Sequence, residues 1–473
     1  MTREITTIVK KEVIETLRDG RYRWGAGIVF VLLLASLFTG WRNVESEIKE
    51  RLAAKAGERE RWLNQDDKNP HSAAHYGIYA FKPKQLLGVL DDGIDLYTGV
   101  AVYLEAHRQN QFEYRRAAEA TAVQRFGDLT AALTMQLLIP LLIVLLTFSV
   151  FTREREQGTM TLLLSLGVSP KQLMIGKLLG AFVTILLIIL PATLIGAVGL
   201  LQTSEMQFDG VRYSLMVASY LGFFLMWCAL SLGVSAWAKS SRSALIALLS
   251  LWFVQSFVVP RVAIHLADER HPLPSLRAYN DEVRKDIRGG IDGHNPADKR
   301  RKELQARLLK EYGVDSVHKL PVNFDAVAMQ EGEEYANQVF DKHFSDLHRR
   351  YNEQNQFYQF AGAISPTIAV QMLSMASAGT DIWHHRHFSE SAEAHRRLLV
   401  RELNMDMAHH SKTGDWEYKA GKSLWQKIPD FEYAPPDVAW AFSNVKESLV
   451  MLLGWLIASL AALSLGVSNL NRL

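Results

Sequence analysis

Six apolar stretches restrict the folds that this sequence can adopt. A helix needs about 20 mostly apolar residues to cross the hydrocarbon core of a bilayer. Six segments reach or nearly reach that length, at residues 24–41, 129–151, 178–201, 213–237, 244–266 and 448–467. Pro260 and Arg261 interrupt the fifth, but proline near a helix end costs little and arginine can extend its charge to the interface. A cleaved signal peptide or buried core helices fit these lengths less well. The pattern predicts a mainly α-helical protein with six transmembrane helices.

The distribution of charge predicts how these helices are oriented. With the N-terminus inside the cell, the inner segments are residues 1–23, 152–177, 238–243 and 468–473, and they hold 13 Lys and Arg against six Asp and Glu. The inner side then carries +7, and because the whole chain has a net charge of +2, the remainder carries −5. This is the positive-inside pattern. It predicts a multi-pass membrane protein with both termini in the cytoplasm.

Two long segments then face outward, residues 42–128 and 267–447, with a short loop between at 202–212. Both are long enough to form cores of their own, and their amphipathic stretches predict largely helical insertions. Cys228 is the only cysteine and lies in an apolar run, so no disulfide can hold them. The near-neutral charge gives no indication of nucleic-acid binding.

Two segments on the inner side have a distinctive pattern. Residues 1–23 place apolar residues at helical spacing opposite charged ones, as in a helix that lies on a membrane surface. In the loop 152–177, charged residues are followed by an apolar helix from about Thr159 to Leu166, with Gly167 placed to end it. Ser169, Pro170 and Gln172 form a capping box for the next helix. A short helix with an exposed apolar face suits docking into a groove of another protein, although a re-entrant or merely connecting loop is the alternative.

A family resemblance rests on these two segments and on others further along the chain. The order Arg155-Glu-x-Gly-Thr, Leu-Leu, Ser169-Pro-x-x-Leu and Gly-Lys177 resembles the coupling-helix region of ABC-2-type permeases, and Lys10-Lys-Glu with Leu-Arg-Asp19 resembles their amphipathic elbow helix. Leu251-Trp-Phe-Val with Val-Val-Pro260-Arg, and Ser365-Pro with Ala378-Gly-Thr-Asp, are similar to a subfamily with large periplasmic insertions of unsettled role. The resemblance covers essentially the whole chain.

The resemblance implies the permease subunit of an ATP-driven transporter of exporter type, which pairs with a second permease copy or paralogue and with separate cytoplasmic ABC ATPase subunits. Mg-ATP would be bound by those ATPases, because the nearest phosphate-loop pattern, at Gly176-Lys177, has Lys171 in place of the first glycine and Leu178 after the lysine. The chain itself is expected to hold no cofactor and to catalyse no reaction. The residues expected to couple the chain to the ATPase are Glu154, Glu156, Gly158, Thr159, Leu163 and Ser169. The glutamates are expected to meet basic residues of the partner, and Leu163 to be the apolar anchor.

The sequence also fits other interpretations of its function. The two outward segments would also suit a force-transmitting or scaffolding protein that acts on a periplasmic partner and moves no substrate across the bilayer. The central parts of the spans hold no Asp, Glu, His or Lys, so they favour contact with membrane lipids and energy from a partner over an ion pathway. His384, His385 and His387 form a cluster with helical metal-ligand spacing, but solvated surface histidines explain it more simply, so no metal site is expected.

Overall fold

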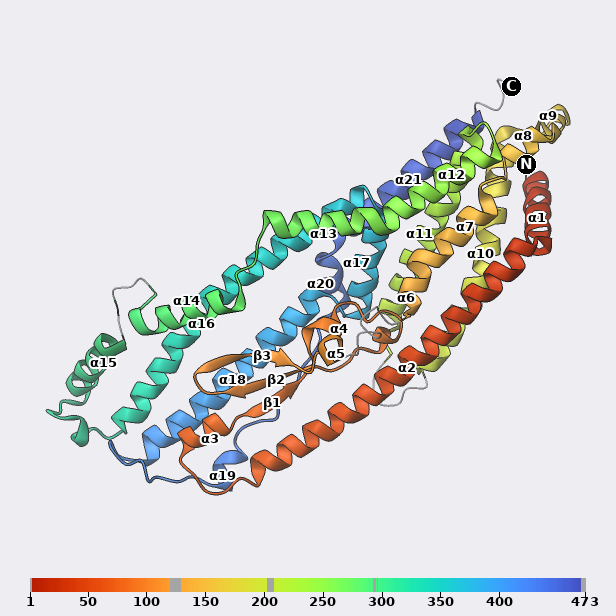
Figure 1. The fold of residues 1–473 in the computed structure, drawn as a ribbon. Coiled ribbons are helices and arrows are strands. Elements are labelled where there is room, and N and C mark those ends of the chain that lie inside the picture. Colours follow the sequence, from red (N-terminus) through yellow and green to blue (C-terminus); the bar gives the residue numbers. More distant parts are fainter. Residues whose placement is uncertain (1, 120–128, 202–207, 292–294, 296, 469–473) are drawn as a thin grey trace.

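The computed structural model describes residues 2–119, 129–201, 208–291, 295 and 297–468. Within these residues, six helices are long and apolar enough to cross a membrane, as predicted. They are α2 (Gly20–Leu63), the continuous stretch Ala131–Glu156, α10 (Pro170–Leu201), α11 (Gly210–Trp237), the continuous stretch Ser241–Arg270 and α21 (Lys446–Ser468). They contain the apolar runs of the sequence and form a bundle (Figure 1).

Two of these six stretches contain a π-helical turn before a proline. The second stretch runs from α6 (Ala131–Leu133) through the π-turn η3 (Thr134–Leu138) into α7 (Ile139–Thr147) and α8 (Thr152–Glu156). The fifth runs from α12 (Ser241–Phe253) through η4 (Val254–Val258) into α13 (Val259–Arg270). Proline lacks an N–H group and clashes with the carbonyl four residues earlier, and a wider turn accommodates both effects. Pro260 therefore lies inside a helix that continues to Arg270, and not near the end of a span.

Helix α11 is the centre of the bundle, where it packs against α7, α21 and α17 (Pro366–Ala378). Its side chains Phe223, Phe224, Trp227 and Cys228 are fully buried. Helix α17 belongs to the second insertion, yet nearly all of it is buried against the bundle, so this insertion does not lie wholly outside it.

We call the part of the molecule that projects beyond one end of the bundle the head (Figure 1). The outer half of α2 runs along one side of it and α16 (Phe324–Phe360) along the other, and α18 (Ile382–His410) lies between them. The head also contains α3 (Pro70–Tyr76), and α14 (Leu276–Gly289) and α15 (Ala297–Tyr312) at its far end. The short helices η1 (Leu86–Val89), α4 (Asp95–Thr98), α5 (Arg116–Glu119), η5 (Val317–Lys319), η6 (Ala361–Ala363), α19 (Lys422–Trp425) and α20 (Val438–Ser443) complete the two insertions.

The first insertion contains a sheet that the sequence did not predict. Strands β1 (Ile78–Phe81), β2 (Ala101–Glu105) and β3 (Arg108–Glu113) form an antiparallel sheet in the order β1-β2-β3. Ile78 pairs with Leu104 and Ala80 with Val102, so their side chains lie on the same, buried face.

The two insertions share one core, contrary to the expectation of separate cores. Trp62, from the end of α2, packs edge-on against Trp425, with ring centroids 5.9 Å apart, and its indole N–H donates to the Trp425 carbonyl oxygen. The same cluster joins Leu104 of the sheet to Phe388 and Leu399 of α18. Neither insertion can bury this surface alone, so the head is one folding unit.

Candidate functional site at the base of the bundle

The end of the bundle opposite the head, which we call the base, carries α1 (Thr2–Arg18), α8 and α9 (Thr159–Ser165) (Figure 1). Helix α1 lies against the first turns of α10. This contact requires glycine on α10, because a Cβ atom at Gly176 would come within 2.5 Å of Ile8 and one at Gly180 within 2.6 Å of Glu12. The apolar face of α1 is therefore used in part against α10.

A buried ion network joins three elements of the base. The Lys177 ammonium on α10 lies 2.7 Å from Glu154 Oε1 on α8 and 2.8 Å from Glu12 Oε1 on α1, and its side chain is only 2% exposed. Lys11 Nζ lies 3.2 Å from Glu12 Oε1 and 3.4 Å from Glu154 Oε1. Burial raises the pKa of the Glu12 carboxyl, but the charges of Lys177 and Lys11 outweigh burial and hold that pKa below its ordinary value. The Glu12 carboxyl is therefore ionised, and the ion pairs hold α1, α8 and α10 together.

Further hydrogen bonds tie α8 to the rest of the bundle. The Arg155 guanidinium donates to the carbonyl oxygens of Ser235 and Ala238, where α11 ends. The Glu156 carboxylate accepts from the Ser241 N–H at 2.7 Å and the Ser241 hydroxyl at 2.8 Å, where α12 begins. Helix α8 therefore contacts the ends of most of the helices that meet at the base.

The loop between α8 and α10 has the local structure that its sequence predicts. Gly158 has a φ of 71° and Gly167 a φ of 85°, both in the left-handed region that favours glycine, and they flank α9. The Ser169 N–H donates to Gln172 Oε1 at 2.8 Å, and the Gln172 N–H donates to Ser169 Oγ at 3.3 Å. This reciprocal pair is the predicted capping box, and it starts α10.

Helix α9 turns one apolar face inward and another outward. Met160 is buried, and Leu163 is partly buried against the bundle core. Leu162 is 59% exposed and Leu166 is 72% exposed. Leucines this exposed on a helix of seven residues, held between two glycines, form a small protruding apolar surface.

The structure gives several of the predicted coupling residues contacts within the chain. Glu154 is buried and paired with Lys177, so it does not present its charge to a partner as was expected. Leu163 faces the bundle, and Leu162 and Leu166 occupy the exposed positions that were expected of it. The Thr159 hydroxyl donates to the Glu154 carbonyl oxygen at 3.2 Å. Glu156, Gly158, Thr159 and Ser169 are exposed.

Sequence reasoning did not single out the lysines of this network. Lys177 entered only as the end of the coupling-region pattern, and Lys11 and Glu12 only as part of the elbow-helix pattern, with no contact expected between them. A signal was present, since a lysine that directly precedes a long apolar run needs a counter-charge when its helix packs against others. The sequence could not show which carboxylates supply it, because α1 is far from α10 along the chain.

The three histidines singled out in the sequence have separate partners. His384 Nδ1 lies 2.8 Å from Asp381 Oδ1, and its Nε2 lies 3.3 Å from Arg212. His387 Nδ1 lies 3.0 Å from the Tyr433 hydroxyl. His385 packs on the ring of Phe112, and burial lowers its pKa to about 3. These contacts place the three histidines in a polar part of the interior of the head.

A second polar cluster joins the head to the bundle. Asp91, which follows η1, accepts a hydrogen bond from Ser374 of α17 at 2.5 Å. Ser374 accepts from Tyr220 of α11 at 2.9 Å, and the Tyr220 hydroxyl accepts from Gln136 of η3 at 3.0 Å. Gln136 is therefore the last member of a chain of hydrogen bonds that runs from the head into the bundle.

Comparison with known families matches two models to the chain. Residues 84–273 match the model described as ABC-2 family transporter protein, and residues 277–434 match the model described as a domain of unknown function (DUF3526). The second match covers most of the second insertion and includes α14, α15, α16 and α18. A comparison with curated proteins finds no match. The chain is thus a multi-pass membrane protein with an ABC-2 family transporter domain and a second, appended domain of unknown function.

Proposed function

We propose that this chain is the transmembrane subunit of an ATP-driven ABC-2-type exporter and that α9 docks on a separate cytoplasmic ATPase. The observation that supports this proposal most directly is the exposure of Leu162 and Leu166 on a short helix at the base. An apolar helix face of this kind fits a hydrophobic groove of another protein. The match to the ABC-2 family model supports an ABC ATPase as the protein that carries this groove.

The ion network gives α9 a connection to the membrane helices. A push on α9 acts on α8, which directly precedes it in the chain, across Gly158. Helix α8 passes the displacement to α10 and α1 through the Lys177 network, and to α11 through Arg155. Because the Lys177 contacts are buried and charged, they resist stretching more than apolar contacts do, and the helices are expected to move together.

The proposal also specifies which end of the chain faces the cytoplasm and how the subunits assemble. The base would be cytoplasmic, as its positive charge predicts, and the head would be periplasmic. Two permease subunits would pair in the bacterial inner membrane, and Mg-ATP would be bound by their ATPases. Exposed apolar side chains on α2, among them Trp24, Ile28, Val31 and Phe38, would face lipid or the second subunit.

A force-transmitting protein that moves no substrate is the second candidate, and the way the head is attached favours it. Arg212, at the start of α11, donates to the carbonyl oxygens of Ala376 at 3.0 Å and Pro436 at 2.6 Å. Together with the hydrogen-bond chain from Asp91, this contact fixes the head to the central helix of the bundle. Movement of α11 would then move the head, which would act on a periplasmic partner.

The docking proposal is tested by co-purification of the ATPase with a Leu162→Asp/Leu166→Asp variant. The ATPase is expected to be lost, because two carboxylates would be buried in an apolar groove. Leu276→Asp, an equally drastic change at an exposed leucine of the head, is the matched control and should retain the ATPase. Full retention by the α9 variant would refute the docking surface. ATP-dependent substrate movement in reconstituted vesicles would then favour the exporter over the force-transmitting protein.

A further inference from the structure

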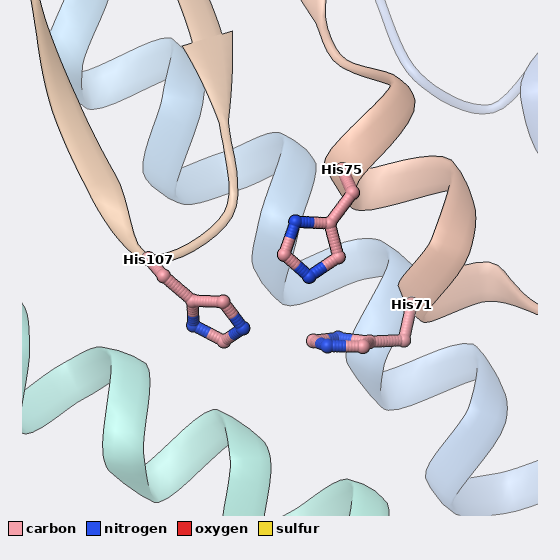
Figure 2. A group of neighbouring side chains, drawn as sticks. All are labelled: His71, His75 and His107. Atoms are coloured by element: carbon pink, nitrogen blue, oxygen red, sulfur yellow. The ribbon is translucent and has the colours of Figure 1, made fainter.

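Three histidines of the head converge on one point at its surface. His71 and His75 lie one turn apart on α3, and His107 lies in the two-residue turn between β2 and β3. Their ring centroids are 4.8 to 5.2 Å apart, and each offers a nitrogen within 4.8 Å of the others. Figure 2 shows the three rings turned toward a shared space. Among the described residues, this is the one group of three or more His, Cys, Asp or Glu side chains with metal-binding spacing.

The surroundings of His107 orient its ring. Glu333 of α16 is buried, and its Oε1 accepts from the His107 backbone N–H at 2.9 Å and pairs with His107 Nδ1. The other ring nitrogen of His107 points toward His71 and His75 (Figure 2). A carboxylate behind a histidine is a common outer partner in zinc sites, where it fixes the tautomer and raises the basicity of the ligand nitrogen.

His71 is oriented from the opposite side. Its Nδ1 lies 3.3 Å from Oδ1 of Asn404, a fully buried residue of α18. The Asn404 amide group donates to Gln330 Oε1 at 3.1 Å, which fixes its oxygen toward His71. His71 Nδ1 therefore acts as the donor, and its Nε2 is left as an acceptor. Two of the three imidazoles are thus prepared to bind through Nε2.

The backbone conformation of His107 also indicates that this residue has a functional role. Its φ is 64°, in the left-handed region, where glycine or asparagine would form this tight turn with less strain. Strained residues of this kind persist where the surrounding structure uses them. Here the strain places the imidazole beside the two on α3.

We propose that His71, His75 and His107 bind a divalent transition metal, with Zn²⁺ as the best fit. Imidazole nitrogens suit zinc, and three histidines leave a fourth tetrahedral position open to water or to a ligand. Ligand nitrogens around zinc lie about 3.3 Å apart for bonds of about 2.0 Å, and the histidine nitrogens lie within 4.8 Å of one another, so each pair needs to close by at most about 1.5 Å. Rotation of the exposed His75 and His107 side chains supplies that movement.

The metal would join the two insertions of the head. All three ligands belong to the first insertion, whereas Glu333 and Asn404, which hold two of them, belong to the second. Binding would therefore fix α3 and the β2–β3 turn to each other and, through these partners, to α16 and α18. This inference does not depend on the proposed transport function.

Metal binding is tested on the full chain, purified in detergent with metal-free buffers, by equilibrium dialysis against Zn²⁺ and by the visible absorption of bound Co²⁺. We expect one Zn²⁺ per chain and the strong absorption of tetrahedral Co²⁺. His75→Ala should weaken Zn²⁺ binding at least 10-fold, and Glu333→Gln about 10-fold. His265→Ala, which removes an exposed histidine of α13, should leave both readouts unchanged.

The outcomes distinguish a specific Zn²⁺ site at the three histidines from nonspecific binding of Zn²⁺ to exposed histidines. Loss of binding in His75→Ala together with retention in His265→Ala supports the site. Less than one Zn²⁺ per wild-type chain, or equal binding by wild type and His75→Ala, overturns it. His75 is exposed, so its substitution is expected to leave the fold intact, and a normal elution profile for this variant makes the comparison valid.

Discussion

The ammonium of Lys177 lies 2.7 Å from the carboxylate of Glu154, and both side chains are buried where three helices meet. Lys177 is 23 residues from Glu154 and 165 from Glu12, its second partner, so the contact joins the loop to the N-terminal helix through α10. A buried ion pair is weak evidence for stability by itself, because desolvation offsets its attraction. Its value here is that it fixes the relative position of α1, α8 and α10.

Lys177→Met is expected to destabilise the base strongly. The substitution keeps the length of the side chain but leaves Glu12 and Glu154 buried without their main counter-charge, and removal of one partner from a buried pair costs about 3–5 kcal/mol. Thermal unfolding of the purified chain should show a lower midpoint. Lys171→Met, on the same helix but exposed, is the matched control. Equal midpoints for the two variants would show that the network is not structural.

Asp91 makes the junction between head and bundle sensitive to pH. Burial raises the pKa of its carboxyl to about 6, with smaller contributions from Asp92 and Asp95, while hydrogen bonds from Ser374 and the Gly93 N–H oppose the rise. The folded state thus binds this proton more tightly than the unfolded state. Its contribution to stability is complete below about pH 4 and is lost as pH rises through about 6.

The corresponding measurement compares wild type with Asp91→Asn between about pH 4 and 7. Asparagine cannot ionise and still accepts a hydrogen bond from Ser374. The wild type should lose on the order of 3 kcal/mol more than the variant over this range. Parallel pH profiles of the unfolding midpoint would contradict the assignment.

Trp62→Ala tests whether the two insertions form one folding unit. Truncation of a buried tryptophan costs about 3–5 kcal/mol, and Trp62 contacts Trp425 across the two insertions. Hydrogen exchange should therefore accelerate in α18 as well as around Trp62. Trp416→Ala, at a tryptophan that is exposed, should change neither. Faster exchange confined to residues near Trp62 would indicate separate cores.

Sequence periodicity was sufficient for the spans and for local structure. The six apolar runs, the capping box at Ser169 and the glycine after α9 each depend on residues within a few positions of one another. Their physical causes, hydrophobic length and backbone hydrogen bonding, act locally. They could therefore be read from the sequence.

Features that depend on distant pairs could not be read in this way. The partners of Lys177, the contact between Trp62 and Trp425, and the convergence of His107 with His71 each follow from the tertiary fold. The β2–β3 hairpin was missed because its short strands alternate weakly between polar and apolar residues. The chain also contains 15 histidines, so spacing along the sequence favoured the cluster at His384 over the one that the fold assembles.

Site-specific photo-crosslinking from position 166 in native membranes measures whether α9 contacts an ATPase. Leu166 is 72% exposed, so a photoreactive residue at this position should leave the fold unchanged. A crosslink to an ATP-binding protein is expected from position 166 and none from position 276 in the head. A crosslink from position 166 to lipid alone, or to no ATP-binding protein, would contradict the docking of α9 on an ATPase.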